Sequence, residues 1–283
     1  MKTARQVKDQ IRNLSKKTGV DPQILIRQYM MDHLLERISQ TRYRDHFILK
    51  GGMLISALVG VALRSTLDMD ATIKGFPMEI TALQQMFNEI LTIDLDDGIR
   101  YQLNGIDNIH EESDYNGYRL SLTAFLDESR IPLKIDITTG DRITPKEIEF
   151  SYPMLIEKRS IQICTYNLET VLAEKLETII SRNIANTRMR DFYDIYILTE
   201  LKWVLIRPDL LRSAFAETSK YRGNQNLHHE AQAVFDAIKA SPDLERHWQN
   251  YQRRYAYASE TTYSDVCLNL GRLIHFIQNE NTG

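Results

Sequence analysis

The sequence predicts an α/β (α+β) protein with a mixed-sheet core, preceded by helices and followed by a helical domain. The first observation is that apolar and polar residues alternate with strand-like spacing only within residues 46–138. The second is that apolar residues recur at helical spacing before this region and again beyond about residue 165. We therefore expect an N-terminal helical segment (1–45) packed on an α/β core (46–165), and a C-terminal helical domain (166–283). No Pro/Gly/Ser-rich linker separates these parts, so we expect a cleft where the core meets the C-terminal helices.

Local signals justify each element in chain order. Residues 3–17 form a helical pattern, and the Gly19-Val20-Asp21-Pro22 break starts a second helix, with Asp21 as N-cap and Pro22 at the first helical position. In the core we expect strands over 46–50, 67–73, 99–109, 117–126 and 131–138, helices over 53–63 and 78–92, and a polar turn over 111–117. In the C-terminal part we expect helices over 167–182, 189–201, 207–220, 228–240, 243–256 and 262–279.

Composition excludes several classes of protein. The 283-residue chain has 43% hydrophobic and 26% charged residues, which is typical of globular proteins. No apolar run approaches the roughly 18 residues of a membrane span, and the N-terminus lacks the apolar stretch of a signal peptide, so we expect a soluble cytoplasmic protein. A net charge of −3 disfavours coating of nucleic acid by bulk electrostatics, although a local basic stripe stays open. Cys164 and Cys267 have no companions at metal-ligand spacing, and no P-loop motif is present.

Two carboxylates two residues apart are the most informative feature. Asp68 and Asp70 lie in an otherwise apolar strand pattern, and alternation directs both to one face. Asp136, flanked by isoleucines, is a third carboxylate in a strand pattern, and the three converge if their strands are neighbours. Like charges at this spacing repel unless a cation lies between them, and oxygen-only ligands suit Mg²⁺, with two ions possible. The alternative is a solvated strand face or a helix-capping device.

The Gly51-Gly52 pair separates the first strand pattern of the core from the helix that follows. It forms either a simple tight turn or a place where backbone N–H groups at a helix N-terminus approach a phosphate.

Five blocks in this order resemble the AbiEii/AbiGii toxin nucleotidyltransferases, a family of the DNA polymerase β-like nucleotidyltransferase superfamily. The resemblance extends from about residue 15 to about 200, and its blocks are Phe47-Ile48-Leu49-Lys50-Gly51-Gly52, Arg64-Ser65-Thr66-Leu67-Asp68-Met69-Asp70, Lys134-Ile135-Asp136, Leu172-Ala173-Glu174-Lys175-Leu176 and Arg190-Asp191-Phe192-Tyr193-Asp194-Ile195-Tyr196. It implies a toxin, active in phage defence, that transfers a nucleotide from an NTP to RNA, such as a tRNA 3′ end, and is neutralised by a separately encoded antitoxin.

The resemblance also implies residue roles. Asp68 and Asp70 match the metal-binding D-x-D, and Asp136 matches the third acidic position. Lys175 matches a lysine that contacts the nucleotide phosphates, and Asp194, with Asp191 as partner, matches the last acidic motif. Nucleotide binding is further expected of residues in the first two blocks, namely Lys50, Gly51, Gly52, Arg64, Ser65 and Thr66. One departure is that Gly51-Gly52 replaces the usual Gly-Ser, so a serine hydroxyl for the phosphates is absent here.

Several features leave alternatives open. Lys175 with Asp194 forms either a fixed charge for a phosphate or an interhelical salt bridge. Arginines around the turn after residue 182 (Arg182, Arg188, Arg190) contact RNA or triphosphate, or are simply solvated, and late tyrosines (Tyr251, Tyr255, Tyr257, Tyr263) stack on bases or pack helices.

The sequence therefore predicts a Mg²⁺-dependent nucleotidyltransferase that releases pyrophosphate. Nucleotidylation of a protein side chain is an alternative acceptor reaction. A non-catalytic nucleotide- or partner-binding protein on the same fold is the alternative from another class.

Overall fold

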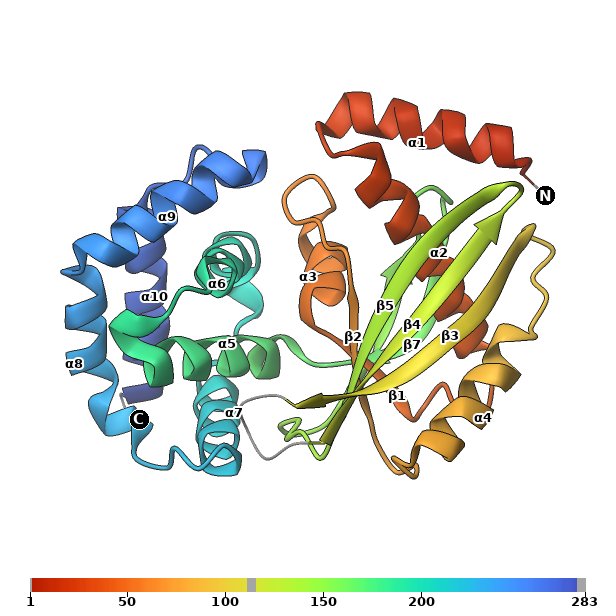
Figure 1. Ribbon diagram of the computed structural model, residues 1–283. Coiled ribbons are helices and arrows are strands. Elements are labelled where there is room, and N and C mark those ends of the chain that lie inside the picture. The colour runs from red at the N-terminus through yellow and green to blue at the C-terminus, as the bar shows by residue number, and fades with distance from the viewer. Residues whose placement is uncertain (1, 111–115, 279–283) are drawn as a thin grey trace. The chain divides into compact units, whose positions relative to one another are not determined.

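The computed structural model describes residues 2–110 and 116–278, so most of the polar turn expected over 111–117 lies outside the described residues. The chain forms two compact units (Figure 1). Unit 1 comprises Met1–Gly140 and Ile148–Thr165, and unit 2 comprises Asp141–Glu147 and Tyr166–Gly283. The cleft expected between the core and the C-terminal helices stays a prediction.

Unit 1 is built on a mixed sheet, as the sequence predicts. Its helices are α1 (Ala4–Thr18), α2 (Pro22–Ser39), α3 (Gly51–Val59) and α4 (Ile80–Leu91). Its strands are β1 (Phe47–Lys50), β2 (Met69–Ile73), β3 (Ile99–His110), β4 (Asn116–Leu126), β5 (Ser129–Thr139), β6 (Ile148–Pro153) and β7 (Ser160–Thr165). Within the described residues the sheet has seven strands in the order β3-β4-β5-β2-β1-β7-β6, with β2–β5 and β1–β7 parallel and the other pairs antiparallel.

The sequence predictions for unit 1 need three corrections. Strands β6 and β7 were not expected, because β6 is an exposed edge strand whose residues lack a buried apolar alternation. The helix expected over 53–63 begins at Gly51 and ends at Val59, because Gly60, with φ 96°, turns the chain out of the helix. The strand expected over 67–73 begins only at Met69.

Capping and packing explain the helices that cover the sheet. Asp21 accepts a hydrogen bond from the Gln23 amide (2.6 Å) and Pro22 occupies the first turn of α2, as the sequence predicts. Helix α2 packs on β5 and β7, and α4 packs on β3 and on α2, so both helices cover the same side of the sheet (Figure 1). Strand β5 directs its fully buried isoleucines to this side, including Ile135 and Ile137. The opposite side carries the exposed Lys134 and the half-buried Asp136.

A buried charged network holds α2 to the segment before β3. His33 lies 2.9 Å from Asp97 through its Nδ1 atom, and the Arg37 guanidinium donates to both Asp97 oxygens at 2.8 Å. Burial alone would lower the pKa of His33, but the contact with Asp97 and the nearby Glu157 carboxylate, 3.6 Å away, raise it to about 9. His33 therefore carries a proton in the folded protein at neutral pH.

Unit 2 contains helices and no strand among its described residues, which confirms the prediction of a helical C-terminal part. Its helices are α5 (Leu168–Arg182), α6 (Met189–Lys202), α7 (Pro208–Tyr221), α8 (Leu227–Lys239), α9 (Pro242–Arg254) and α10 (Tyr263–Gln278), with short 3₁₀ turns η1 (Asn183–Ala185), η2 (Trp203–Leu205) and η3 (Ala256–Ala258). Among the described residues, no helix combines the length and the apolar composition needed to cross a membrane.

Candidate active site

Four charged residues lie side by side across four strands of unit 1. Lys50 on β1 is the register partner of Asp70 on β2, and Asp70 is the partner of Asp136 on β5. Asp136 is in turn the partner of Arg119 on β4. Because directly opposed residues on neighbouring strands project to the same face, these side chains form one line, which we call the charged row. Two carboxylates stand at its centre with one cation on either side of them, and beyond Arg119 the register continues to Asp107 on β3.

The charged row confirms that β2 and β5 are neighbours, but it corrects the position of Asp68. Asp68 lies in the bend just before β2 and not in the strand, because the chain first turns through Arg64–Asp68, where the Thr66 hydroxyl donates to the Asp68 carbonyl (3.3 Å). It nevertheless stays close to the row, since its charge raises the pKa of Asp70. Of the three carboxylates expected to converge, Asp70 and Asp136 are direct register partners on neighbouring strands, and Asp68 lies in the bend that precedes one of these strands.

The Asp70 carboxylate is in an unfavourable position for an anion. Burial raises its pKa most, the Lys50 ammonium lowers it, and the negative charges of Asp136 and Asp68 raise it further. A hydrogen bond from the backbone N–H of Gly52, in the first turn of α3, also favours the charged form. The net effect is a raised pKa, so additional positive charge placed beside Asp70 would be strongly stabilised.

Arg119 was missed by sequence reasoning. Its guanidinium makes a two-pronged salt bridge to Asp136, with Nε 2.7 Å from Oδ1 and a terminal nitrogen 2.6 Å from Oδ2. The Arg119 side chain is 43% exposed and that of Asp136 24% exposed, so the pair lies at the surface of the open face. A single arginine in a strand pattern gives no signal by itself, and only the β4–β5 register brings it to the row.

The Gly51-Gly52 pair lets Asp70 lie directly against the start of α3. Gly51 has φ 66°, and a methyl group added there would lie 2.8 Å from Cγ of Asp70 and closer still to its Oδ2. A methyl group at Gly52 would lie 2.8 Å from the Thr66 hydroxyl and 3.1 Å from the Arg64 guanidinium. The side chains of Arg64 and Thr66 thus occupy the volume that a serine at position 52 would need. This packing gives a physical reason for the departure from Gly-Ser.

Two more of the predicted nucleotide-binding residues are buried. Arg64 is 2% exposed and Thr66 is 6% exposed, and both pack on Gly52. Ser65, between them, is half-buried, and its carbonyl accepts a hydrogen bond from Arg64 (2.5 Å). In this arrangement Arg64 and Thr66 fix the turn that carries Asp68, and their contact with a nucleotide stays a prediction.

The carboxylates of the row are the type of ligand that Mg²⁺ prefers, but they are not already arranged around a metal-binding position. Among the described residues, no group of three or more His, Cys, Asp or Glu side chains is arranged to hold a metal ion. Both Asp136 oxygens are engaged by Arg119, and Asp70 lies against Gly51. Each carboxylate oxygen retains a second lone pair, and carboxylates are the protein ligands that Mg²⁺ prefers. Asp68, Asp70 and Asp136 could therefore hold a cation that competes with Arg119 for Asp136.

A second cluster of predicted site residues lies within unit 2. Lys175 on α5 is 2.8 Å from Asp191 and 2.7 Å from Asp194, both on α6. The side chains are 14%, 7% and 0% exposed in that order. Burial by itself lowers the pKa of Lys175, but the two aspartates raise it above its ordinary value. The three residues therefore come together as the sequence suggested, in a buried cluster with one positive and two negative charges.

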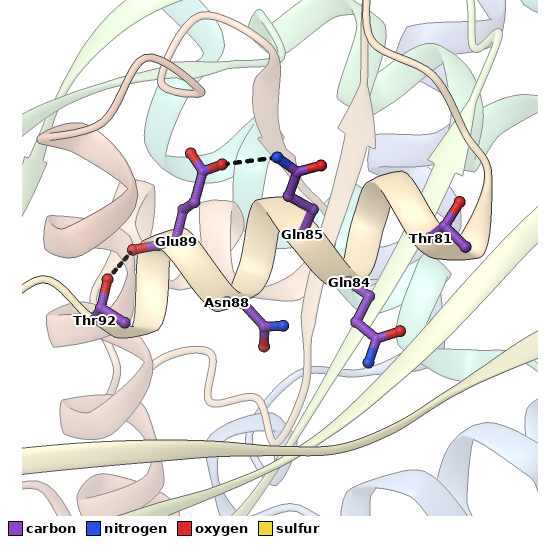
Figure 2. Close-up of a pocket in the computed structure, with 6 residues that line it drawn as sticks. All are labelled: Thr81, Gln84, Gln85, Asn88, Glu89 and Thr92. Carbon is purple, nitrogen blue, oxygen red and sulfur yellow. Dashed lines mark hydrogen bonds between the residues drawn. The ribbon is translucent and has the colours of Figure 1, made fainter.

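Two surface depressions are large enough to take a ligand. The first lies along α4 and is lined by Thr81, Gln84, Gln85, Asn88, Glu89 and Thr92 (Figure 2). All six residues come from one helix, so no second element encloses a ligand there. The second lies in unit 2, where the start of α6 and the end of α9 meet at Asp191, and it is described below.

The mixed sheet of unit 1 sets two carboxylates against a helix that begins with two glycines. In comparison with family models, residues 33–269 match the model "Nucleotidyl transferase AbiEii toxin, Type IV TA system". The chain therefore belongs to the AbiEii nucleotidyl transferase toxin family of type IV toxin–antitoxin systems. Among curated proteins, none matches the chain significantly in sequence.

Solved structures with a related chain trace include a putative nucleotidyltransferase from H. pylori, which is 18% identical with a TM-score of 0.48 and covers 92% of this chain and 96% of that one. JHP933 from Helicobacter pylori is 17% identical with a TM-score of 0.49, covering 92% and 93%. An antigenic nucleotidyltransferase-like protein from Paracoccidioides brasiliensis is 12% identical with a TM-score of 0.37, covering 74% and 91%.

Proposed function

We propose that the protein is a cytoplasmic, Mg²⁺-dependent toxin that transfers a nucleoside monophosphate from an NTP to the 3′ end of an RNA, with tRNA as the first candidate. The observation that carries this proposal is the charged row. Two carboxylates are held next to each other by strand register, beside the first turn of α3. The cations of the row only partly offset their repulsion, since the pKa of Asp70 stays raised. Family membership adds a cognate antitoxin as a partner.

Asp68 and three residues of the charged row have roles in the proposed reaction. Asp68 and Asp70 hold the cation that accompanies the triphosphate, and the N–H groups at the start of α3 together with Lys50 attract its phosphates. Bound Mg²⁺ supplies positive charge for the phosphates and makes the attacking hydroxyl more acidic. Asp136 orients that hydroxyl and receives its proton. The RNA 3′ oxygen then bonds to the α-phosphorus, the bond from the α-phosphorus to the bridging oxygen breaks, and pyrophosphate leaves.

Lys175 contributes to the proposed reaction only if it keeps a proton to offer a phosphate. Its raised pKa ensures the charge, and two of its three N–H groups face Asp191 and Asp194. The remaining N–H group is the one that Lys175 can donate to a phosphate.

The test is incubation of the purified protein with Mg²⁺, each α-³²P-labelled NTP in turn and total bacterial RNA, resolved on a denaturing gel. We expect label in tRNA-sized RNA with the wild type and none with Asp70→Asn or Asp68→Asn. Asp236→Asn is the matched control, since Asp236 is an exposed aspartate on α8, outside the sheet. Label in protein instead of RNA would favour side-chain nucleotidylation, and no label with any NTP would favour a non-catalytic binding protein.

A further inference from the structure

The depression at the junction of α6 and α9 in unit 2 is rich in cations. Its volume is about 440 Å³. Three arginines line it, Arg188 and Arg190 at the start of α6 and Arg254 at the end of α9, and all three are exposed. The remaining lining residues are Thr187, Met189, Asp191, His247, Asn250, Tyr251 and Tyr255. We call this depression the arginine pocket.

Among the described residues that line the arginine pocket, Asp191 is the only one with a carboxylate, and both of its oxygens lie next to cations. One oxygen of Asp191 accepts from Lys175 at 2.8 Å, and the other lies 3.0 Å from Nε of Arg188. The described lining residues therefore include three guanidinium groups and one carboxylate. A polyanion is the ligand that such a set of guanidinium groups recognises.

Aromatic rings hold two of these arginines in place. Arg190 donates to the Tyr255 hydroxyl (3.2 Å) and lies 5.7 Å from the centre of that ring, and Arg254 lies 5.5 Å from it. Tyr255 is itself supported by Tyr251 and Tyr257, with ring centres 4.6 and 5.4 Å away. Guanidinium groups fixed in this way lose less conformational freedom on binding than solvated arginines do.

We propose that the arginine pocket binds a single-stranded segment of the acceptor RNA. This inference rests on the proposed function, because that function makes RNA a substrate of the protein. The guanidinium groups take phosphates, and the half-exposed Tyr255 and Tyr257 offer ring surface to unstacked bases, a combination typical of single-stranded RNA sites. An acidic peptide would use the arginines but leave the rings without a role, so the rings favour RNA.

The test measures RNA binding separately from nucleotide transfer. A 5′-fluorescein-labelled 12-nucleotide single-stranded RNA is titrated with the full-length protein by anisotropy, without Mg²⁺ or NTP, at several salt concentrations. For Arg190→Ala/Arg254→Ala we expect an affinity about a hundredfold weaker, about tenfold for each charged donor lost. The slope of log affinity against log salt should also fall by about 1.4, since two phosphate contacts disappear.

Control variants distinguish a loss of pocket contacts from a general loss of charge or of folding. Arg246→Ala removes an exposed arginine from the same helix, one paired with Asp243 and outside the pocket, and should bind RNA like the wild type. Arg190→Lys/Arg254→Lys keeps the charge but loses the planar fork, and should weaken binding by an intermediate factor. Thermal melting of each variant shows that it is folded.

Three results would overturn the proposal. The wild type binds no RNA, or the folded Arg190→Ala/Arg254→Ala variant binds RNA as tightly as the wild type does. The third is that this variant loses affinity only for NTP or for a labelled oligoglutamate peptide. Failure of the proposed function has another signature. In that case the wild type binds RNA through the pocket but transfers no label to it.

Discussion

Replacement of Gly51 by alanine tests whether the close approach of Asp70 to α3 matters for function. A residue other than glycine at φ 66° costs about 1–2 kcal/mol of stability. The new methyl group would also stand 2.8 Å from Cγ of Asp70, whereas carbon atoms in contact prefer about 3.5–4.0 Å. Asp70 must therefore move by about 1 Å. A displacement of that size in a site for phosphoryl transfer reduces the rate about a hundredfold.

Gly19→Ala is the matched control for this experiment. Gly19 has φ 73°, but a methyl group there would meet no atom within 4 Å, so it carries the same backbone strain without the collision. We expect both variants to lose about 1–2 kcal/mol of unfolding free energy in urea titrations from strain, and only Gly51→Ala to lose transfer activity. A folded Gly51→Ala protein with wild-type activity, or an equal loss of activity in Gly19→Ala, would refute the reasoning.

Three further predictions concern charges. Lys175→Met removes the ammonium that contacts the buried carboxylates of Asp191 and Asp194, and it should lower the free energy of unfolding by about 3–5 kcal/mol in urea titrations; an unchanged midpoint would show that the cluster is not structural. The pKa of His33 is raised from about 6.5 in the unfolded chain to about 9 in the fold. Protonated His33 therefore stabilises the fold fully below pH 6.5 or so, and this stabilisation is lost as the pH rises through about 9. His33→Gln should therefore remove a fall of up to about 3 kcal/mol in unfolding free energy between these pH values, and a variant with the same pH profile as the wild type would contradict this. Arg119→Met frees the carboxylate of Asp136 and removes a repelling charge, so calorimetric titration should show Mn²⁺ binding about tenfold more tightly, and unchanged affinity would mean that Arg119 does not compete with the cation.

Spacing along the chain was sufficient to predict much of the fold. The Asp21-Pro22 start of α2, the helices of unit 2 and the strands β1 to β5 each carry a local signal of capping or periodicity. Strand β6 could not be predicted in this way, because its pairing with β7 at the sheet edge, and not an apolar face, determines its conformation.

The residues of the candidate site likewise differ in whether a local sequence signal identifies them. Asp70 and Asp136 could be found because a carboxylate flanked by buried apolar residues is conspicuous in a sequence. Arg119 could not, since its role follows from strand register between β4 and β5. The reason for glycine at position 52 was equally hidden, because it depends on where Arg64 and Thr66 pack after the chain has turned.

The two charged clusters differ in one property that separates a binding site from a structural ion pair. In the cluster of unit 2, Lys175 lies within hydrogen-bonding distance of both aspartates, so each buried charge has a direct partner. In the charged row, the register of β2 and β5 prevents Asp70 and Asp136 from moving apart, and the pKa of Asp70 stays raised despite Lys50. The folded state then binds a proton at Asp70 more tightly than the unfolded chain does, so this group's contribution to stability declines as pH rises above the unfolded pKa of about 3.8.

Neutral substitutions should therefore have opposite effects in the two clusters. Asp70→Asn relieves the repulsion and should raise the melting temperature at pH 7 while it removes activity, whereas Asp194→Asn takes a partner from buried Lys175 and should lower the melting temperature. Added Mg²⁺ should raise the melting temperature of the wild type but not that of Asp70→Asn, because only the wild type has the Asp70 carboxylate to bind the ion. A melting temperature for Asp70→Asn below that of the wild type without Mg²⁺ would mean that the row is a structural ion network, and the assignment of the active site to it would have to be abandoned.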